Sequence, residues 1–92
     1  MSPHDSVFRA LSDPTRRRIL EILAEHDLTA GDIASRFPIA FASVSHHLGI
    51  LKGAGLVASD REGQYIRYRI NTTVYQELVA YFMKLFAGGA DA

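Results

Sequence analysis

The middle of the chain carries a run of small hydrogen-bonding side chains at helical spacing. Ser43, Ser45 and His46 can each donate and accept hydrogen bonds. Gly49 would let another surface approach closely, and Lys52 adds a positive charge. Hydroxyl, imidazole and ammonium groups contact phosphates and base edges in nucleic acids. A plain solvated helix face can look the same, so the interpretation depends on the elements around these residues.

The residues before and after this run predict two helices joined by a sharp turn. A short helix over about residues 31–36 ends before Pro38, which disfavours helical backbone in the residue that precedes it. A second helix spans about residues 41–52, and glycines at positions 53 and 55 stop it. Its apolar positions recur at the i, i+3, i+4, i+7 spacing of a buried face, which is made of Val44, His47, Leu48 and Leu51. We interpret His47 as a structural histidine.

A two-stranded antiparallel ribbon is predicted over residues 56–71, with its turn at Glu62-Gly63. In the second strand Ile66, Tyr68 and Ile70 alternate with polar or charged neighbours, as in a strand with one buried face. The order helix, turn, helix, ribbon predicts a mainly α fold with a β-hairpin wing, a winged helix-turn-helix of about five helices. That fold places its second helix in the DNA major groove.

The whole chain, residues 1–92, fits a single domain of this kind. Residues 4–26 form two helices, the second starting at the Asp13-Pro14 signal. Residues 29–53 form the helix-turn-helix, with Thr29 as a cap. Residues 72–87 form the last helix, which Asn71 or Thr72 caps and Gly88-Gly89 ends.

Composition excludes several classes of protein. The chain lacks cysteine, so disulfides and thiolate sites are absent, and no stretch predicts a signal peptide or a membrane segment. We therefore expect a cytoplasmic protein. The formal net charge is zero, but residues 33–59 contain no acid, which gives a modestly basic face. Adjacent His46 and His47 point about 100° apart on a helix and cannot readily chelate one ion. No catalytic constellation appears, so we expect no enzyme, no metal site and no cofactor.

The last helix is too apolar for a helix packed on a monomer. On a helical wheel its apolar side chains cover roughly 200°. The surplus predicts a homodimer, because a symmetric partner subunit is the simplest cover for such a surface. The predicted interface combines the first and last helices through Val7, Phe8, Leu11, Tyr75, Leu78, Val79, Phe82, Met83 and Phe86.

The predicted DNA-binding residues come from three elements and are Arg16, Phe41, Ala42, Ser43, Ser45, His46, Gly49, Lys52, Arg61 and Arg67. Three assignments have alternatives. Arg16 and its neighbours could meet a phosphate or a carboxylate such as Asp13. Phe41 could touch a thymine methyl or pack on its own turn. The ribbon arginines could be ordinary guards of an edge strand.

Three segments carry a resemblance to a known family. Residues 8–16 read FRALSDPTR, residues 45–48 read SHHL and residues 54–57 read AGLV. In this order and spacing they resemble the ArsR family of winged-helix repressors. Residues 28–34, 61–64 and 71–74 resemble its SdpR-type autorepressor branch. The resemblance implies a dimeric repressor on an inverted-repeat operator, often at its own promoter, which releases DNA when a metal or another signal arrives.

The chain departs from the metal-sensing members of that family. It has no cysteine pair on the third helix and no His or Asp on the last helix, as predicted over residues 72–87. Ala40 and Phe41 stand where relatives often have a polar cap for the recognition helix. Two rival functions stay open: a repressor that responds to a small-molecule effector in a cleft beside the last helix, and a winged helix that binds only other proteins.

Overall fold

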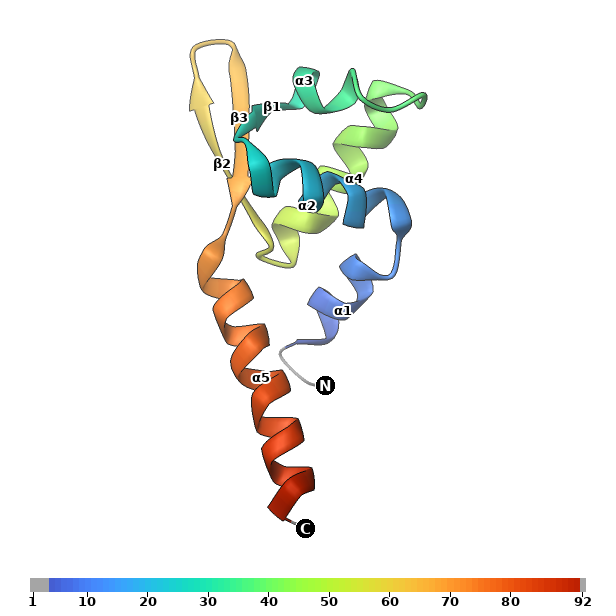
Figure 1. The fold of residues 1–92 in the computed structure, drawn as a ribbon. Helices are drawn as coiled ribbons and strands as arrows, with labels where there is room; N and C mark the ends of the chain where they lie inside the picture. The colour runs from blue at the N-terminus through green and yellow to red at the C-terminus, as the bar shows by residue number, and fades with distance from the viewer. Residues whose placement is uncertain (1–3, 92) are drawn as a thin grey trace.

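Five helices and a three-stranded antiparallel sheet make up the part of the chain that the structure describes, which is residues 4–91 and the side chains of residues 4–87. The structure is a computed structural model. Along the chain the elements are α1 (Asp5–Leu11), α2 (Pro14–Glu25), β1 (Leu28–Thr29), α3 (Ala30–Ala34), α4 (Phe41–Gly53), β2 (Val57–Glu62), β3 (Tyr65–Ile70) and α5 (Thr72–Asp91). Helices α1–α4 form the body, the β2–β3 wing projects on one side, and α5 runs away from the body (Figure 1). The predicted mainly α, winged helix-turn-helix fold is confirmed.

Side-chain caps begin three of the helices. Asp13 Oδ2 accepts a hydrogen bond from Arg16 N at 3.0 Å, and Pro14 occupies the first helical position of α2. Thr29 and Asp32 form a reciprocal capping box at the start of α3. Asn71 Oδ1 accepts from Thr73 N at 3.2 Å at the start of α5. The capping residues predicted at these three positions are confirmed.

The sheet differs from the prediction in two ways. Residues 28–29, for which no strand was predicted, form the short strand β1, which pairs with β3 at Tyr68 and Arg67. The predicted turn was one residue early, because Glu62 pairs with Tyr65 and leaves Gly63-Gln64 as the loop. Gly63 has φ +63°, and a two-residue hairpin loop favours a positive φ at its first position.

One face of α4 supplies much of the core. Val44, Leu48 and Leu51 have no exposed surface, and they pack in a cluster with residues from α2, α3 and the start of β2. The predicted inward face of α4 is therefore confirmed, with His47 only partly buried. Complete burial of three aliphatic side chains on successive turns fixes the rotation of α4 and determines which residues face outward.

One expectation about the C-terminus, that Gly88-Gly89 ends the last helix, was wrong. Helix α5 continues through Gly88 and Gly89 to Asp91. Glycine lowers helix stability by about 1 kcal/mol but keeps the backbone donor that proline lacks, so it need not end a helix. Val7 and Leu78, predicted at a subunit interface, are 3% and 6% exposed within their own chain. The rings of Phe8 and Phe82 lie 6.1 Å apart, so α1 already covers the first turns of α5.

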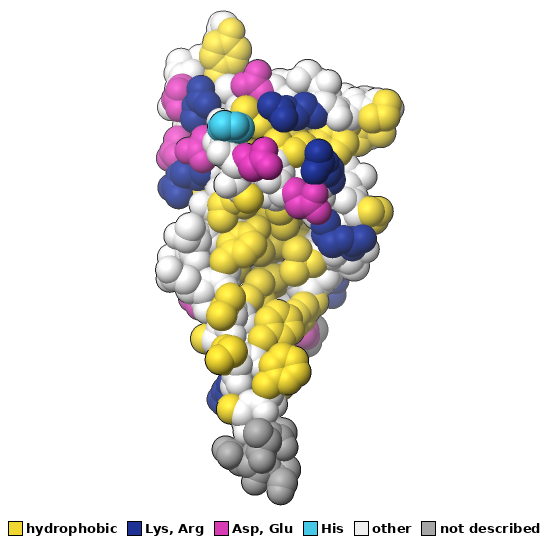
Figure 2. Space-filling view, in the orientation of Figure 1, with side chains coloured by type: hydrophobic (Ala, Val, Ile, Leu, Met, Phe, Trp, Pro, Cys, Tyr) yellow, Lys and Arg dark blue, Asp and Glu magenta, His cyan; other side chains and the backbone are white. Residues whose placement is uncertain are grey.

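Beyond this contact α5 exposes large apolar side chains. Each is at least 44% exposed, including Phe82 beside Phe8, and they are Val79, Phe82, Met83, Leu85 and Phe86. Figure 2 shows apolar side chains in a band that runs from the body along α5, while charged side chains of both signs gather at the wing end. The molecule therefore has one polar end and one apolar end.

Candidate nucleic-acid interface

The outer face of α4 consists of small and hydrogen-bonding residues. The positions of α4 predicted to bind DNA are all exposed, and besides Phe41 they are Ala42, Ser43, Ser45, His46, Gly49 and Lys52. Within the described part of the chain, the side chains of Ser43, Ser45 and Lys52 make no hydrogen bond or ion pair. Their donors and acceptors are free for another molecule.

Two residues of α4 shape the approach to this face. A Cβ built on Gly49 meets nothing within 4 Å, so the absent side chain is not required by packing inside the chain. Phe41 is 56% exposed at the first position of the helix. Ala40 precedes it without a side-chain cap, and the amides of Ser43 and Val44 bond the Ala40 carbonyl. An exposed aromatic ring therefore lies at the start of a helix that has no side-chain cap.

Arg16 lies behind α4 and not on the exposed face. Its Nε donates to Ala10 O at 2.6 Å and its Nη2 donates to Arg9 O at 3.2 Å, both carbonyls near the end of α1. Its Nη1 lies 3.2 Å from His47 Nδ1, on the inner side of α4. One guanidinium thus joins α1, α2 and α4. In the structure these intramolecular partners hold the guanidinium, because helix-terminal carbonyls attract a cation as a phosphate would, and the predicted phosphate contact stays a prediction.

Asp13 completes this partly buried junction. The backbone N–H of Arg16 donates to its carboxylate and holds the pKa of Asp13 below its ordinary value of 3.8. His47 Nδ1 lies 3.9 Å from Asp13 Oδ2. The side chains of Arg17 and Arg18 are also engaged, with Leu11 O at 2.7 Å and Glu21 Oε2 at 2.9 Å respectively. The arginine cluster therefore serves the body of the domain, and sequence reasoning missed the carbonyl acceptors because they depend on tertiary structure.

The two faces of the wing carry different charges. Residues paired across β2 and β3 share a face, so Arg61 lies with Ile66, on the side of Tyr68 that packs against the body. The opposite face carries Arg67 and Arg69 together with two acids of β2.

The acids neutralise the arginines on that opposite face. Arg67 Nε donates to Glu62 Oε2 at 2.7 Å, and Arg69 Nε donates to Asp60 Oδ2 at 3.1 Å. Arg67 Nη1 also donates to Asp27 O at 3.3 Å, which ties the wing to the body. Arg61 contacts only the carbonyl of Gly63, at 3.1 Å, and pairs with no acid in the described residues. Arg61 is the wing arginine that keeps its charge available.

Other kinds of site have little support in residues 4–91. No three His, Asp or Glu side chains there gather in a way that could hold a metal ion. No helix in the same part of the chain is long and apolar enough to cross a membrane.

Comparison with known proteins gives consistent matches. Residues 13–59 match the family described as "Bacterial regulatory protein, arsR family". The chain is 48% identical over 85 residues to the transcriptional repressor SdpR of Bacillus subtilis, covering 92% of this chain and 94% of that protein.

Solved structures show the same fold. An ArsR-like transcriptional regulator from Rhodococcus superposes with a TM-score of 0.87 at 34% identity, over 96% of this chain and 83% of that one. A homodimeric winged helix-turn-helix DNA-binding domain from Mycobacterium bovis gives a TM-score of 0.75 at 28% identity, over 96% and 82% of the two chains. The matched family segment runs from the cap of α2 into β2 and includes all of α4. This chain belongs to the ArsR family of bacterial regulatory proteins.

Proposed function

We propose that the protein is a sequence-specific DNA-binding transcriptional repressor. The observation that carries the proposal is the outer face of α4, where exposed serines, His46 and a glycine lie above a fully packed inner face. In this proposal α4 enters the major groove and Arg61 on the wing holds the adjacent phosphate backbone. The relative from Bacillus subtilis is named a transcriptional repressor, which supports the direction of the effect.

We further propose that the repressor acts as a homodimer. The exposed apolar stripe of α5, with Phe8 of α1 beside it, supplies the surface that a second subunit would cover. The similar domain from Mycobacterium bovis is described as homodimeric. A two-fold dimer fits an inverted-repeat operator with half-sites about one helical turn apart, and repression follows when the dimer occludes a promoter. The first candidate for the repressed promoter is that of its own gene. The protein would act in the bacterial cytoplasm, and we assign it no catalytic role.

Selection of bound sequences from a random duplex pool tests the proposal. We expect an inverted repeat to emerge, bound more weakly as salt rises because phosphate contacts release counterions. The double substitution Ser45→Ala and His46→Ala removes free donors from the α4 face and should reduce the preference for that repeat over random duplex by about tenfold. Light scattering should show the same oligomer as the parent protein.

A matched control uses the same residue types elsewhere. Ser6 and His26 are both exposed, outside α4 and the wing. Replacing both with alanine should leave operator preference unchanged. Equal effects of the two double substitutions would show that the α4 face is misassigned. Absence of salt-dependent binding to any duplex would favour a protein-interaction module and overturn the proposal.

A further inference from the structure

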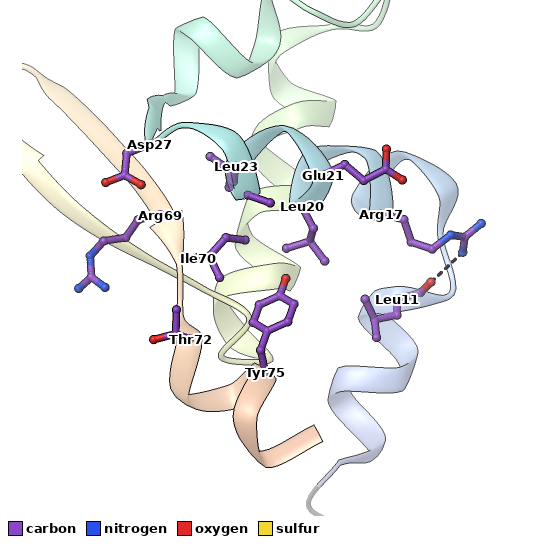
Figure 3. Close-up of a pocket in the computed structure, with 11 residues that line it drawn as sticks. Leu11, Arg17, Leu20, Glu21, Leu23, Asp27, Arg69, Ile70, Thr72 and Tyr75 are labelled. Carbon is purple, nitrogen blue, oxygen red and sulfur yellow. Dashed lines mark hydrogen bonds between the residues drawn. The ribbon is translucent and has the colours of Figure 1, made fainter. Parts of the chain in front are cut away.

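A cleft with a volume of about 670 Å³ lies between α2, β3 and the start of α5, next to the end of α1 (Figure 3). This volume is within the range of small-molecule binding sites. The cleft lies away from the outer face of α4, and none of the residues assigned to DNA contact lines it. It is therefore separate from the proposed DNA-binding face, whereas Leu11 and Tyr75 in its wall are also among the residues predicted at the subunit interface.

The inner wall of the cleft is apolar with one polar atom. Leu20 and Leu23 of α2 and Ile70 of β3 face Tyr75 of α5 across it (Figure 3). The Tyr75 hydroxyl is buried and has no hydrogen-bond partner. Burial raises the pKa of Tyr75 above its ordinary value of 10.0, so the group stays a neutral donor. Buried hydroxyls are normally paired, so this one is available to a ligand that reaches the inner end of the cleft after a small shift of the ring.

The mouth of the cleft has one cation without an acidic partner. Glu21 at the mouth pairs with Arg18, and Arg69 pairs with Asp60. Arg17 pairs with no carboxylate in the described residues. Its Nη1 donates to Leu11 O at 2.7 Å, the dashed line in Figure 3. That bond holds the guanidinium in place and leaves other N–H groups free for an anion.

We propose that this cleft binds a small monocarboxylate with an apolar body. The carboxylate pairs with Arg17, the body lies against Leu20, Leu23 and Ile70, and a polar substituent deeper in the ligand reaches the Tyr75 hydroxyl. Asp27 lies on the side of the cleft opposite Arg17 (Figure 3), so a second negative charge on the ligand would be repelled. The chemistry therefore favours one carboxylate over two.

Binding there would act on the position of α5. The cleft is bounded by α2 and β3 of the DNA-reading body on one side and by α5 on the other. Tyr75 precedes Val79 by one helical turn, so the cleft is continuous with the exposed stripe that we assign to the dimer. A ligand that moved α5 relative to α2 would change the spacing of the two α4 helices. This consequence rests on the proposed function, whereas ligand binding itself does not.

Titration of the full chain with 4-phenylbutyrate, followed by amide chemical shifts, tests the site directly. We expect saturable shifts for Leu20, Leu23, Ile70 and Tyr75. The alcohol 4-phenylbutan-1-ol, which has the same body without the charge, should bind about tenfold more weakly. Arg17→Gln should weaken binding of the acid about tenfold and leave binding of the alcohol unchanged. Arg36→Gln, which changes an exposed arginine that does not line the cleft, should leave both unchanged.

Arg17→Gln also removes the hydrogen bond from Arg17 to Leu11 O, so a second substitution that keeps this bond serves as a check. Ala24 lines the cleft and is exposed, so Ala24→Phe fills the cleft without entering the core and should abolish binding of both probes. Equal affinity for acid and alcohol would overturn the carboxylate assignment. No shifts in a protein that is dimeric by light scattering would show that the second subunit fills the cleft and would overturn the site. Operator binding is measured without either probe, so a failure of the proposed function is recorded separately.

Discussion

Helices α4 and α5 divide their apolar residues in opposite ways. Helix α4 buries Val44, Leu48 and Leu51 completely and shows small polar groups outside. Helix α5 buries Leu78 and then exposes Met83 at 66% and Phe86 at 76%. The apolar content of α4 matches what the core of one chain can cover, and that of α5 exceeds it. This difference supports the proposals that the outer face of α4 contacts DNA and that the exposed stripe of α5 contacts a second subunit.

Truncating the inner side of α4 should have the largest effect. Leu48→Ala removes a side chain with no exposed surface and leaves a cavity, so we expect a loss of about 3 kcal/mol in the free energy of unfolding. Urea denaturation followed by circular dichroism measures it. Phe86→Ala removes a larger side chain from the exposed part of α5 and should cost far less in a dilute sample. A similar cost for both would contradict the comparison.

Charging the outer side of α5 should separate the subunits and leave the fold intact. Phe82→Glu together with Phe86→Glu places two carboxylates on the exposed stripe, where a symmetric interface would bring them together. We expect a monomer by light scattering. Operator affinity should fall roughly 100-fold, because the two reading helices no longer bind as one unit.

Lys84→Glu is the matched control for this double substitution. Lys84 lies on the polar side of the same helix and is exposed, so an added carboxylate there changes charge without entering the stripe. We expect an unchanged oligomer. A dimeric Phe82→Glu, Phe86→Glu protein would show that the stripe is not the subunit interface.

Local patterns in the sequence predicted most of the fold. The caps Asp13, Thr29 and Asn71 act through neighbours within three residues, and the buried face of α4 follows from helical spacing alone. Such signals need no knowledge of the tertiary structure. The same is true of the apolar surplus on α5, which a helical wheel shows directly.

Features that depend on distant partners could not be predicted. Arg16 belongs to α2, but its acceptors end α1 and its third contact, His47, comes 31 residues later. The short strand β1 forms only because β3 offers free backbone groups to Leu28. Glu62 cancels the charge of Arg67 across a hairpin whose turn lies one residue later than predicted. Charge counting along the sequence treats these arginines alike, whereas the fold separates them.

Two arginines of the wing, Arg61 and Arg67, can be compared by their effects on operator binding. We expect Arg61→Ala to weaken operator binding roughly fivefold and to reduce the salt slope by about one, because Arg61 has no acidic partner to replace. Arg67→Ala should weaken binding less, because Arg67 already pairs with Glu62. Fluorescence anisotropy at several salt concentrations distinguishes the two. A larger effect of Arg67→Ala would reverse the assignment of the wing faces.

Gly49→Ala tests whether the outer face of α4 is kept small for contact. The added methyl meets nothing within 4 Å, so the substitution should stabilise the helix, by about 1 kcal/mol at most. Operator affinity should nevertheless fall, because the methyl occupies the space through which the backbone approaches DNA. Gly53→Ala is the control: it is equally open but lies one helical turn further along, at the last residue of α4. A raised Tm with weaker DNA binding for Gly49→Ala alone would show that α4 gives up stability for close approach, whereas unchanged affinity would make Gly49 an ordinary surface residue.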